Sequence, residues 1–178
     1  MIAIMWQWHS LFNSELVQRF DTDETIFRSR SDVKWVFFVR TGCTALVRPL
    51  PSGEQAILQR ASSGHIIAEA SVYTQQYHCD CLALEPTELA YLPRQSFLDK
   101  LRSDLQVAEA WASHLAHGVQ QARMRAEIRS LNTVAERLDA WLFEYGEMPE
   151  KGKWQGLADE LSVSREALYR ELARRRSA

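Results

Sequence analysis

The sequence has few cysteines and lacks the apolar stretches that mark membrane proteins. Its three cysteines, Cys43, Cys79 and Cys81, make a poor disulfide framework and favour a reducing compartment. No apolar run reaches the roughly 18 residues of a membrane span. The short apolar start, Met1–Trp8, lacks the basic region and cleavage signal of an export sequence, so we expect it in the core. These absences predict a soluble cytoplasmic protein.

The chain as a whole also lacks a large net charge, but its charge is unevenly distributed along the sequence. Of its 178 residues, 46% are apolar and 25% charged, with a net charge of −2, as in ordinary globular proteins. Residues 151–178 hold seven basic and four acidic side chains, which leaves −5 for the rest. An acidic body with a basic tail indicates where a polyanion would bind. A solvated charged helix end is the other interpretation of this charge pattern.

The first half of the chain is typical of β-structure. Glycines recur every eleven residues, at Gly42, Gly53 and Gly64, between short runs of β-forming residues. Several short strands at turn spacings of about 8–12 residues favour a sandwich or jelly roll over βαβ units. Pro51–Glu54 fits a hairpin turn. The predicted strands are Trp35–Arg40, Cys43–Arg48, Gln55–Arg60, His78–Glu85 and Glu88–Leu92.

After Pro93 the pattern becomes helical. Ser103 and Gln106 have the spacing of a capping box, and a heptad seam of mostly small residues follows. We favour dimerisation through this seam over packing on the protein's own sheet, because so long a helix exceeds what a small β-domain covers. A second capping box, Thr133–Glu136, begins a helix that ends at Gly146. The seam residues are Leu105, Ala108, Ala112, Leu115, Val119, Ala122 and Ala126.

The last 25 residues carry the most specific motif. Trp154–Leu161 predicts a short amphipathic helix, and Ser162–Ser164 a tight connection in which Ser164 caps the next helix. Arg165–Leu172 then predicts a second helix with a polar first turn. Two short helices joined in this way are typical of a DNA-binding helix-turn-helix, and a plain helical hairpin is the alternative. The predicted DNA-contacting residues are Ser164, Arg165, Glu166, Tyr169 and Arg170.

The tail LADELSVSREALYRELA resembles the DNA-reading element of the CRP/FNR family of bacterial regulators. The run from Trp35 to Tyr73 is similar to that family's cyclic-nucleotide-binding jelly roll. The segment RMRAEIRSLNTVAERLDAWL resembles the end of its dimer helix and the start of its DNA-binding domain. The resemblance implies an α+β fold: a jelly-roll sensor (1–102), a dimerisation helix (103–131) and a winged helix-turn-helix (132–178). By position, Arg165, Glu166 and Arg170 match the family's base-contacting residues.

Two departures from the family pattern change what we expect. The effector pocket would contain Ala68 and Glu69 where nucleotide-binding members carry Gly-Glu, and Tyr77 and His78 where they carry Arg-Ser. A buried cyclic phosphate needs a cation or backbone nest, so we predict that cyclic AMP does not bind. The sequence also stops at Ala178, where the family continues into a β-hairpin wing, and we expect a truncated wing.

Other chemistry is weakly indicated. On a strand, Cys79 and Cys81 face one way and His78 and Asp80 the other, so they cannot converge on a metal; structural cysteines are favoured over redox sensing. His114 and His117 lack further ligands in register. No nucleophile–base pair or phosphate loop is visible, so we predict no enzyme, metal or cofactor.

We therefore predict a dimeric transcriptional regulator that binds double-stranded DNA at an inverted repeat. RNA polymerase and a small-molecule effector, if one exists, are further candidate partners, and no membrane is involved. The alternative is a dimeric interaction or sensor protein that binds DNA weakly or not at all. The intact Ser164–Arg170 segment favours the DNA-binding protein.

Overall fold

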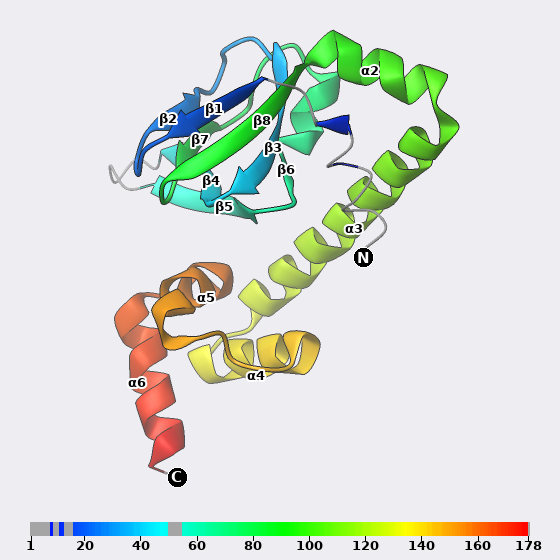
Figure 1. Cartoon of the computed structure of the whole chain (residues 1–178). Coiled ribbons are helices and arrows are strands. Elements are labelled where there is room, and N and C mark those ends of the chain that lie inside the picture. Colours follow the sequence, from blue (N-terminus) through cyan, green and yellow to red (C-terminus); the bar gives the residue numbers. More distant parts are fainter. Residues whose placement is uncertain (1–7, 9–10, 13–15, 50–54, 178) are drawn as a thin grey trace. The chain divides into compact units, whose positions relative to one another are not determined.

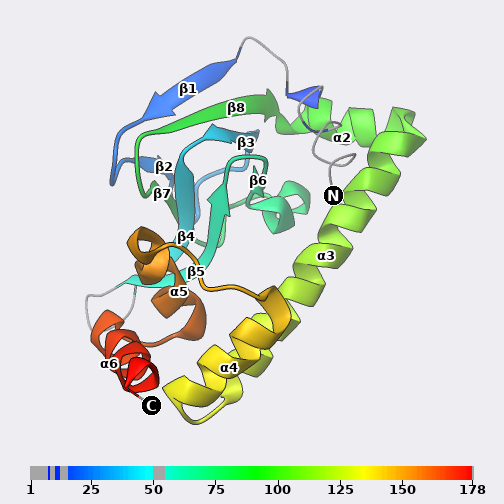
Figure 2. The same ribbon diagram turned by 60° about the horizontal axis from the view of Figure 1, so that its bottom comes forward.

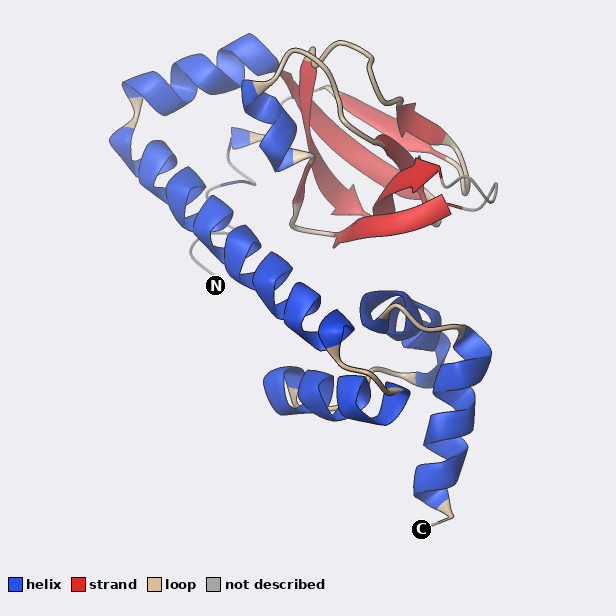
Figure 3. Cartoon of the chain, turned by 180° about the vertical axis from the view of Figure 1, so that it is seen from behind, coloured by secondary structure: helices blue, strands red, loops and turns tan. Residues whose placement is uncertain are grey.

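Figure 1 shows the computed structural model of the chain, which describes residues 8, 11–12, 16–49 and 55–177. The chain divides into two compact units, Met1–His114 and Leu115–Ala178. Strands are confined to the first unit, and helices make up the second (Figure 3). This order confirms the predicted α+β fold, with an antiparallel β-domain followed by helices. The finer division into three segments stays a prediction.

The β-domain consists of two four-stranded antiparallel sheets that enclose one core (Figure 2). Apart from β4 and β5, which follow each other in the sequence, neighbouring strands come from distant parts of the chain, as in a jelly roll. The first sheet has the order β1 (Val17–Phe20), β8 (Thr87–Pro93), β3 (Trp35–Thr41), β6 (Ile66–Ile67). The second has the order β2 (Thr25–Phe27), β7 (Asp80–Ala83), β4 (Cys43–Pro49), β5 (Gln55–Ser62).

Local sequence explains how the central strands connect. Gly42 separates β3 from β4 with a φ of +87°, and a Cβ atom there would collide with the Thr87 side chain and the Pro86 carbonyl oxygen. Only glycine fits both the backbone conformation and the close approach. Thr87 Oγ1 donates to the Cys43 carbonyl oxygen at 3.2 Å and so ties β8 to the start of β4. This hydrogen bond joins the two sheets at one end of the jelly roll.

Most predicted strands agree with the structure, and the differences concern the length of β7 and three short edge strands. β7 is shorter than the predicted His78–Glu85, because His78 and Cys79 precede its first residue, Asp80. Three short strands, β1, β2 and β6, were not predicted, nor was the 3-10 helix η1 (Glu69–Tyr73). The predicted turn Pro51–Glu54 and residues 1–7 of the predicted core segment lie outside the described residues, whereas Trp8 is buried.

The long helix that carries the seam residues begins one residue later than predicted. α2 (Arg94–Ser103) includes Ser103, whose hydroxyl donates to the Asp99 carbonyl oxygen at 2.9 Å. Asp104 follows, and its Oδ1 accepts from the backbone of Gln106 and Val107 at 3.1 and 3.3 Å. The prediction of Ser103 as the N-cap is therefore wrong. A carboxylate at this position satisfies the free amides of α3 (Leu105–Ser130) and interacts favourably with the helix dipole.

α3 is partly buried along the side that carries Trp111. Trp111 is buried among aromatic rings, 5.0 Å from Phe97 and 5.9 Å from Trp8 between ring centroids, and its Nε1 donates to the Tyr73 hydroxyl at 2.9 Å. The predicted seam runs along the same side of the helix: Ala108 and Leu115, three residues before and four residues after Trp111, are half-buried, and the other five seam residues are exposed. Within the described part of the chain the seam is therefore exposed at five of its seven positions.

The second unit is a small helical domain with its own core. α4 (Val134–Tyr145) begins with the predicted capping box, in which Glu136 N–H donates to Thr133 Oγ1 at 3.1 Å. The helix ends at Gly146, whose φ is +85°. Both signals are confirmed. η2 (Lys151–Lys153), α5 (Trp154–Leu161) and α6 (Arg165–Arg176) follow. The core contains Ile128, Leu138, Leu157, Ala158, Leu161 and Leu168.

Candidate nucleic-acid interface and effector pocket

α5 and α6 are joined by a tight turn that the sequence specifies residue by residue. Ser162 takes a left-handed conformation (φ 52°) that ends α5. Val163 N–H then donates back to the Ala158 carbonyl oxygen at 3.0 Å. The Ser164 hydroxyl accepts from Ala167 N–H at 3.1 Å, which confirms the predicted N-cap. Capping by serine fixes both the start and the direction of α6.

The polar face of α6 is exposed along its first turns. Arg165, Glu166 and Arg170 are exposed, whereas Leu168 between them is fully buried. A guanidinium can donate two hydrogen bonds to guanine, and a carboxylate can accept from cytosine. Hydrogen bonds from its own backbone and from Ser164 hold the pKa of Glu166 below its usual value, so this side chain is an acceptor at neutral pH. The structure thus brings these three predicted residues together; their contact with bases stays a prediction.

Tyr169 is half-buried and sits between two other side chains. Its ring meets Trp154 of α5 edge-on, with 5.2 Å between ring centroids. The Arg165 guanidinium carbon lies 5.2 Å from the centre of the same ring, and Arg165 Nη2 donates to the Tyr169 hydroxyl at 3.4 Å. A cation over an aromatic face is attracted by the ring. Tyr169 therefore supports Arg165 on the exposed surface of α6.

An ion-pair cluster that the sequence reasoning missed anchors the far end of α6. Glu171 is 9% exposed and accepts from Arg174 at 2.7 and 2.8 Å and from Arg175 at 2.7 Å. Arg175 also reaches α4, donating to Asp139 Oδ1 at 2.6 Å and to the Ala135 carbonyl oxygen at 3.0 Å. The two guanidinium groups lower the pKa of Glu171 to about 2. The i,i+3 and i,i+4 spacings were the available signal.

Two arginines position α5 by binding backbone carbonyl groups. Arg137 of α4 donates to the carbonyl oxygens of Leu161 and Ser162 at 3.0 and 3.2 Å. Arg129, at the end of α3, donates to those of Glu160 and Asp159 at 3.0 and 3.2 Å. These carbonyl groups are at the C-terminal end of α5, where a cation is favoured by the helix dipole. These hydrogen bonds therefore fix the C-terminal end of α5, where the turn to α6 begins.

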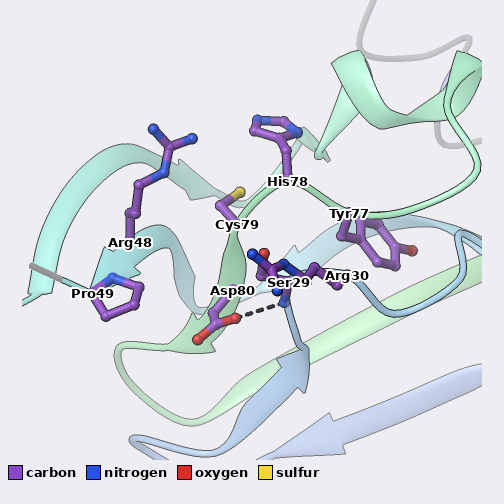
Figure 4. Close-up of a pocket in the computed structure, with 8 residues that line it drawn as sticks. All are labelled: Ser29, Arg30, Arg48, Pro49, Tyr77, His78, Cys79 and Asp80. Carbon is purple, nitrogen blue, oxygen red and sulfur yellow. Dashed lines mark hydrogen bonds between the residues drawn. The ribbon is translucent and has the colours of Figure 1, made fainter.

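The β-domain contains an open pocket of about 510 Å³. It lies where β4 and β7 meet the loop after β2 (Figure 4). The lining includes two arginines, one histidine and one aspartate, but neither Ala68 nor Glu69. Its residues are Ser29, Arg30, Arg48, Pro49, Tyr77, His78, Cys79 and Asp80.

The four predicted effector residues have different environments. Tyr77 is buried, its ring stacked on Phe27 with 3.8 Å between centroids, and its hydroxyl donates to the Trp35 carbonyl oxygen at 2.9 Å. Ala68 is buried with φ 56°, and Glu69 Oε2 is buried without a hydrogen-bond partner among the described residues. His78 is exposed, with Nδ1 3.3 Å from Ser71 Oγ. The position expected to hold a phosphate is thus filled by a core aromatic side chain.

The cysteines follow the predicted alternation. Cys79 and Cys81 are buried, and burial raises the pKa of both thiols. His78 is exposed on the opposite side. Over the described residues, no group of three or more His, Cys, Asp or Glu side chains converges as a metal site would require. A redox role for Cys79 or Cys81 gains no support from thiols that burial keeps protonated.

Comparisons with known proteins bear on both units. Residues 17–104 match the model of the cyclic nucleotide-binding domain. No curated protein sequence matches the chain. Within the described ranges, no helix is both long and apolar enough to cross a membrane.

Several solved structures share the fold. FixK2 from Bradyrhizobium japonicum is 19% identical, with a TM-score of 0.75 over 90% of this chain and 84% of its own. The c-di-GMP-responsive global regulator CLP from Xanthomonas campestris is 16% identical, with a TM-score of 0.71 over 97% and 91%. A CRP-family transcriptional regulator from Thermus thermophilus is 18% identical, with a TM-score of 0.66 over 90% and 84%.

Proposed function

Residues 17–104 belong to the cyclic nucleotide-binding domain family and the chain has the fold of CRP/FNR-family regulators, and from this premise we propose that the protein is a dimeric, sequence-specific DNA-binding regulator of transcription. The observation that carries the proposal is the exposed first half of α6. Three charged side chains, those of Arg165, Glu166 and Arg170, project from a helix that Ser164 caps and α5 supports. This is the arrangement of a recognition helix in the major groove.

The charge around α6 fits a polyanionic partner. Basic residues outnumber acidic ones in the last 28 residues, seven to four. Glu171 is already paired with Arg174 and Arg175, so it offers little repulsion to a phosphate. Arg170 and Arg176 are exposed along the same helix. Phosphate contacts of this kind position a protein on DNA, while the first turns of the helix read bases.

Dimerisation is supported by the exposed positions of the α3 seam. Leu105 is 74% exposed and Val119 50% exposed. Large apolar side chains at heptad spacing with small residues between them are suited to a second copy of the same helix. A two-fold dimer would place two α6 helices about 34 Å apart, one turn of DNA, so its site should be an inverted repeat. It would act in the cytoplasm, where the chromosome lies, and we propose no catalytic activity.

The direct test is selection of bound fragments from a random DNA library by the full chain. We expect an enriched inverted repeat with half-sites one helical turn apart. A library without any enriched sequence would contradict the proposal and favour a dimeric interaction or sensor protein. Enrichment of a single, unpaired half-site would retain DNA reading but contradict the dimer.

A further inference from the structure

The open pocket of the β-domain contains two arginines that the DNA-binding proposal does not use. We propose that this pocket binds a small organic anion through a terminal phosphate or carboxylate group, with Arg30 and Arg48 as its cations. Neither arginine belongs to the Ala68–His78 segment that resembles the family's phosphate-binding segment, of which Tyr77 and His78 also line the pocket. The inference concerns ligand binding alone, so it stands or falls independently of the proposed function.

Arg48 comes from β4, on the strand pair that forms the base of the pocket. Val47 pairs with Asp80 across β4 and β7, so Arg48 lies beside Cys79 at the end of the ladder. In the view of Figure 4 the Arg48 guanidinium and the His78 imidazole stand on either side of the Cys79 thiol. Arg48 is exposed, and its guanidinium has no hydrogen-bond or ion-pair partner among the described residues.

Arg30 lies in the loop after β2, and backbone hydrogen bonds connect this loop to Tyr77. Arg30 N–H donates to the Tyr77 carbonyl oxygen at 2.7 Å, and Tyr77 N–H donates to the Ser31 carbonyl oxygen at 3.0 Å. Arg30 adopts φ +65°, a left-handed conformation that costs a residue with a Cβ roughly 1 kcal/mol or more. Glycine or asparagine would adopt it more easily. An arginine held there against its backbone preference points to a use for its guanidinium.

The described lining has two arginines against one acid, Asp80, so its charge is positive. The Asp80 carboxylate accepts from Ser29 N–H at 2.6 Å, and the Tyr77 hydroxyl is turned away toward Trp35. Burial raises the pKa of Cys79, so its thiol carries no charge at neutral pH. Glu69, the other acid that acts on Cys79, does not line the pocket. In the described lining the two guanidinium groups therefore outnumber the single carboxylate.

The chemistry of guanidinium groups selects the ligand class. Arginine binds a terminal carboxylate or phosphate through two parallel N–H donors, and such charge-assisted pairs are stronger than neutral ones. Two arginines match a doubly charged group better than the single charge of a cyclic phosphodiester. The volume of about 510 Å³ lies in the range of small-molecule sites. The structure thus favours a terminal oxyanion, whether it is a phosphate monoester or a dicarboxylate.

Isothermal titration of the full chain tests this directly. The terminal oxyanions are inorganic phosphate, 5′-AMP and succinate, with cyclic AMP and adenosine as comparators; the response to 5′-AMP against succinate distinguishes the phosphate from the carboxylate source. We expect at least one terminal oxyanion to bind and Arg48→Gln to weaken it by about tenfold or more. Arg30→Gly should weaken it as well, while it leaves the fold intact or more stable because glycine suits φ +65°.

The matched control is Arg28→Gln, which removes an exposed arginine from the same loop but outside the pocket lining. It should leave the affinity unchanged. An equal loss in Arg28→Gln and Arg48→Gln would show general charge attraction and overturn the site. The absence of binding by all three terminal oxyanions, or cyclic AMP binding as tightly as 5′-AMP, would overturn the ligand class. DNA selection is a separate measurement, so neither failure affects the proposed function.

Discussion

The Arg165 guanidinium lies over the Tyr169 ring one helical turn away, 5.2 Å from its centre, with Nη2 3.4 Å from the phenol oxygen. Trp154 of α5 meets the same ring edge-on. Arg165 is thereby supported at the start of α6 by an aromatic pair that joins the two helices. A long side chain held in this way loses less conformational entropy when it binds.

We therefore expect Tyr169→Ala to weaken binding to the selected DNA site by about 0.5–1 kcal/mol, the usual magnitude of an exposed cation–π contact. Tyr169→Phe retains the ring and should bind almost as the native protein does. Fluorescence anisotropy with the selected duplex measures both. Equal losses in the two variants would assign the effect to the hydroxyl group instead.

Arg170→Ala should cost about 1–3 kcal/mol of specific binding and relax the preference at one base pair per half-site, because a bidentate guanine contact is lost. Arg176→Ala removes the same charge from the other end of α6 and serves as the control. It should leave the sequence preference unchanged. Uniform weakening of Arg170→Ala on all sequences would show that this residue contacts only phosphate.

Val119→Glu should convert the dimer to monomers, since an unpaired carboxylate buried in the seam costs several kcal/mol per subunit. Leu115→Glu should do the same. Multi-angle light scattering reports the mass, and specific DNA binding should be lost together with the dimer. Gln121→Glu, an exposed position of α3 outside the seam, is the control. Val119→Glu and Leu115→Glu variants that remain dimeric would exclude the seam as the interface.

Cyclic AMP and cyclic GMP should not bind at useful affinity. Tyr77 stands where the sequence resemblance places the family's phosphate-binding arginine, and its ring and hydroxyl are both engaged in the core, so this position supplies no cation for a cyclic phosphate. Titration near neutral pH tests this. A dissociation constant of about 1 μM, equivalent to roughly −8 kcal/mol, would contradict it.

We expect the ion pairs of Glu171 with Arg174 and Arg175, near the end of α6, to be lost in acid. The pKa of Glu171 is lowered from 4.5 to about 2 by Arg174 and Arg175, so its carboxylate stabilises the folded chain above pH 4.5. That contribution declines as the pH falls from 4.5 toward 2. Glu171→Gln should therefore be less stable than the native protein at neutral pH and equally stable near pH 2. Hydrogen exchange of the α6 amides follows the difference; a constant gap across this range would contradict the assignment.

Local signals in the sequence predicted the C-terminal unit well. Thr133, Gly146 and Ser164 each act within four residues, through a cap or a positive φ. Such interactions depend only on neighbouring residues, so a single sequence contains them. Ser103 and Asp104 are both good capping residues, and the prediction of Ser103 is wrong. Only the extension of α2 through Ser103 decides between them.

The β-domain was predictable as a class but not in its details. Alternation indicated the central strands, whereas β1, β2 and β6 are two to four residues long and leave no periodic signal. Their pairing with distant strands creates them. The pocket could not be predicted for the same reason. Its two arginines lie eighteen positions apart in the sequence, and only the pairing of β2, β4 and β7 brings them to one pocket.

The sequence alone determined the order of the units, the N-caps of α4 and α6 and the polar face of α6, because these depend on residues close together in the chain. Tertiary structure decided the rest. Tyr77 became a core residue by stacking on Phe27, fifty positions away, and Glu171 became an anchor because Arg175 also reaches Asp139 on α4. Contacts at such separations depend on how the elements pack, and packing is a property of the whole fold.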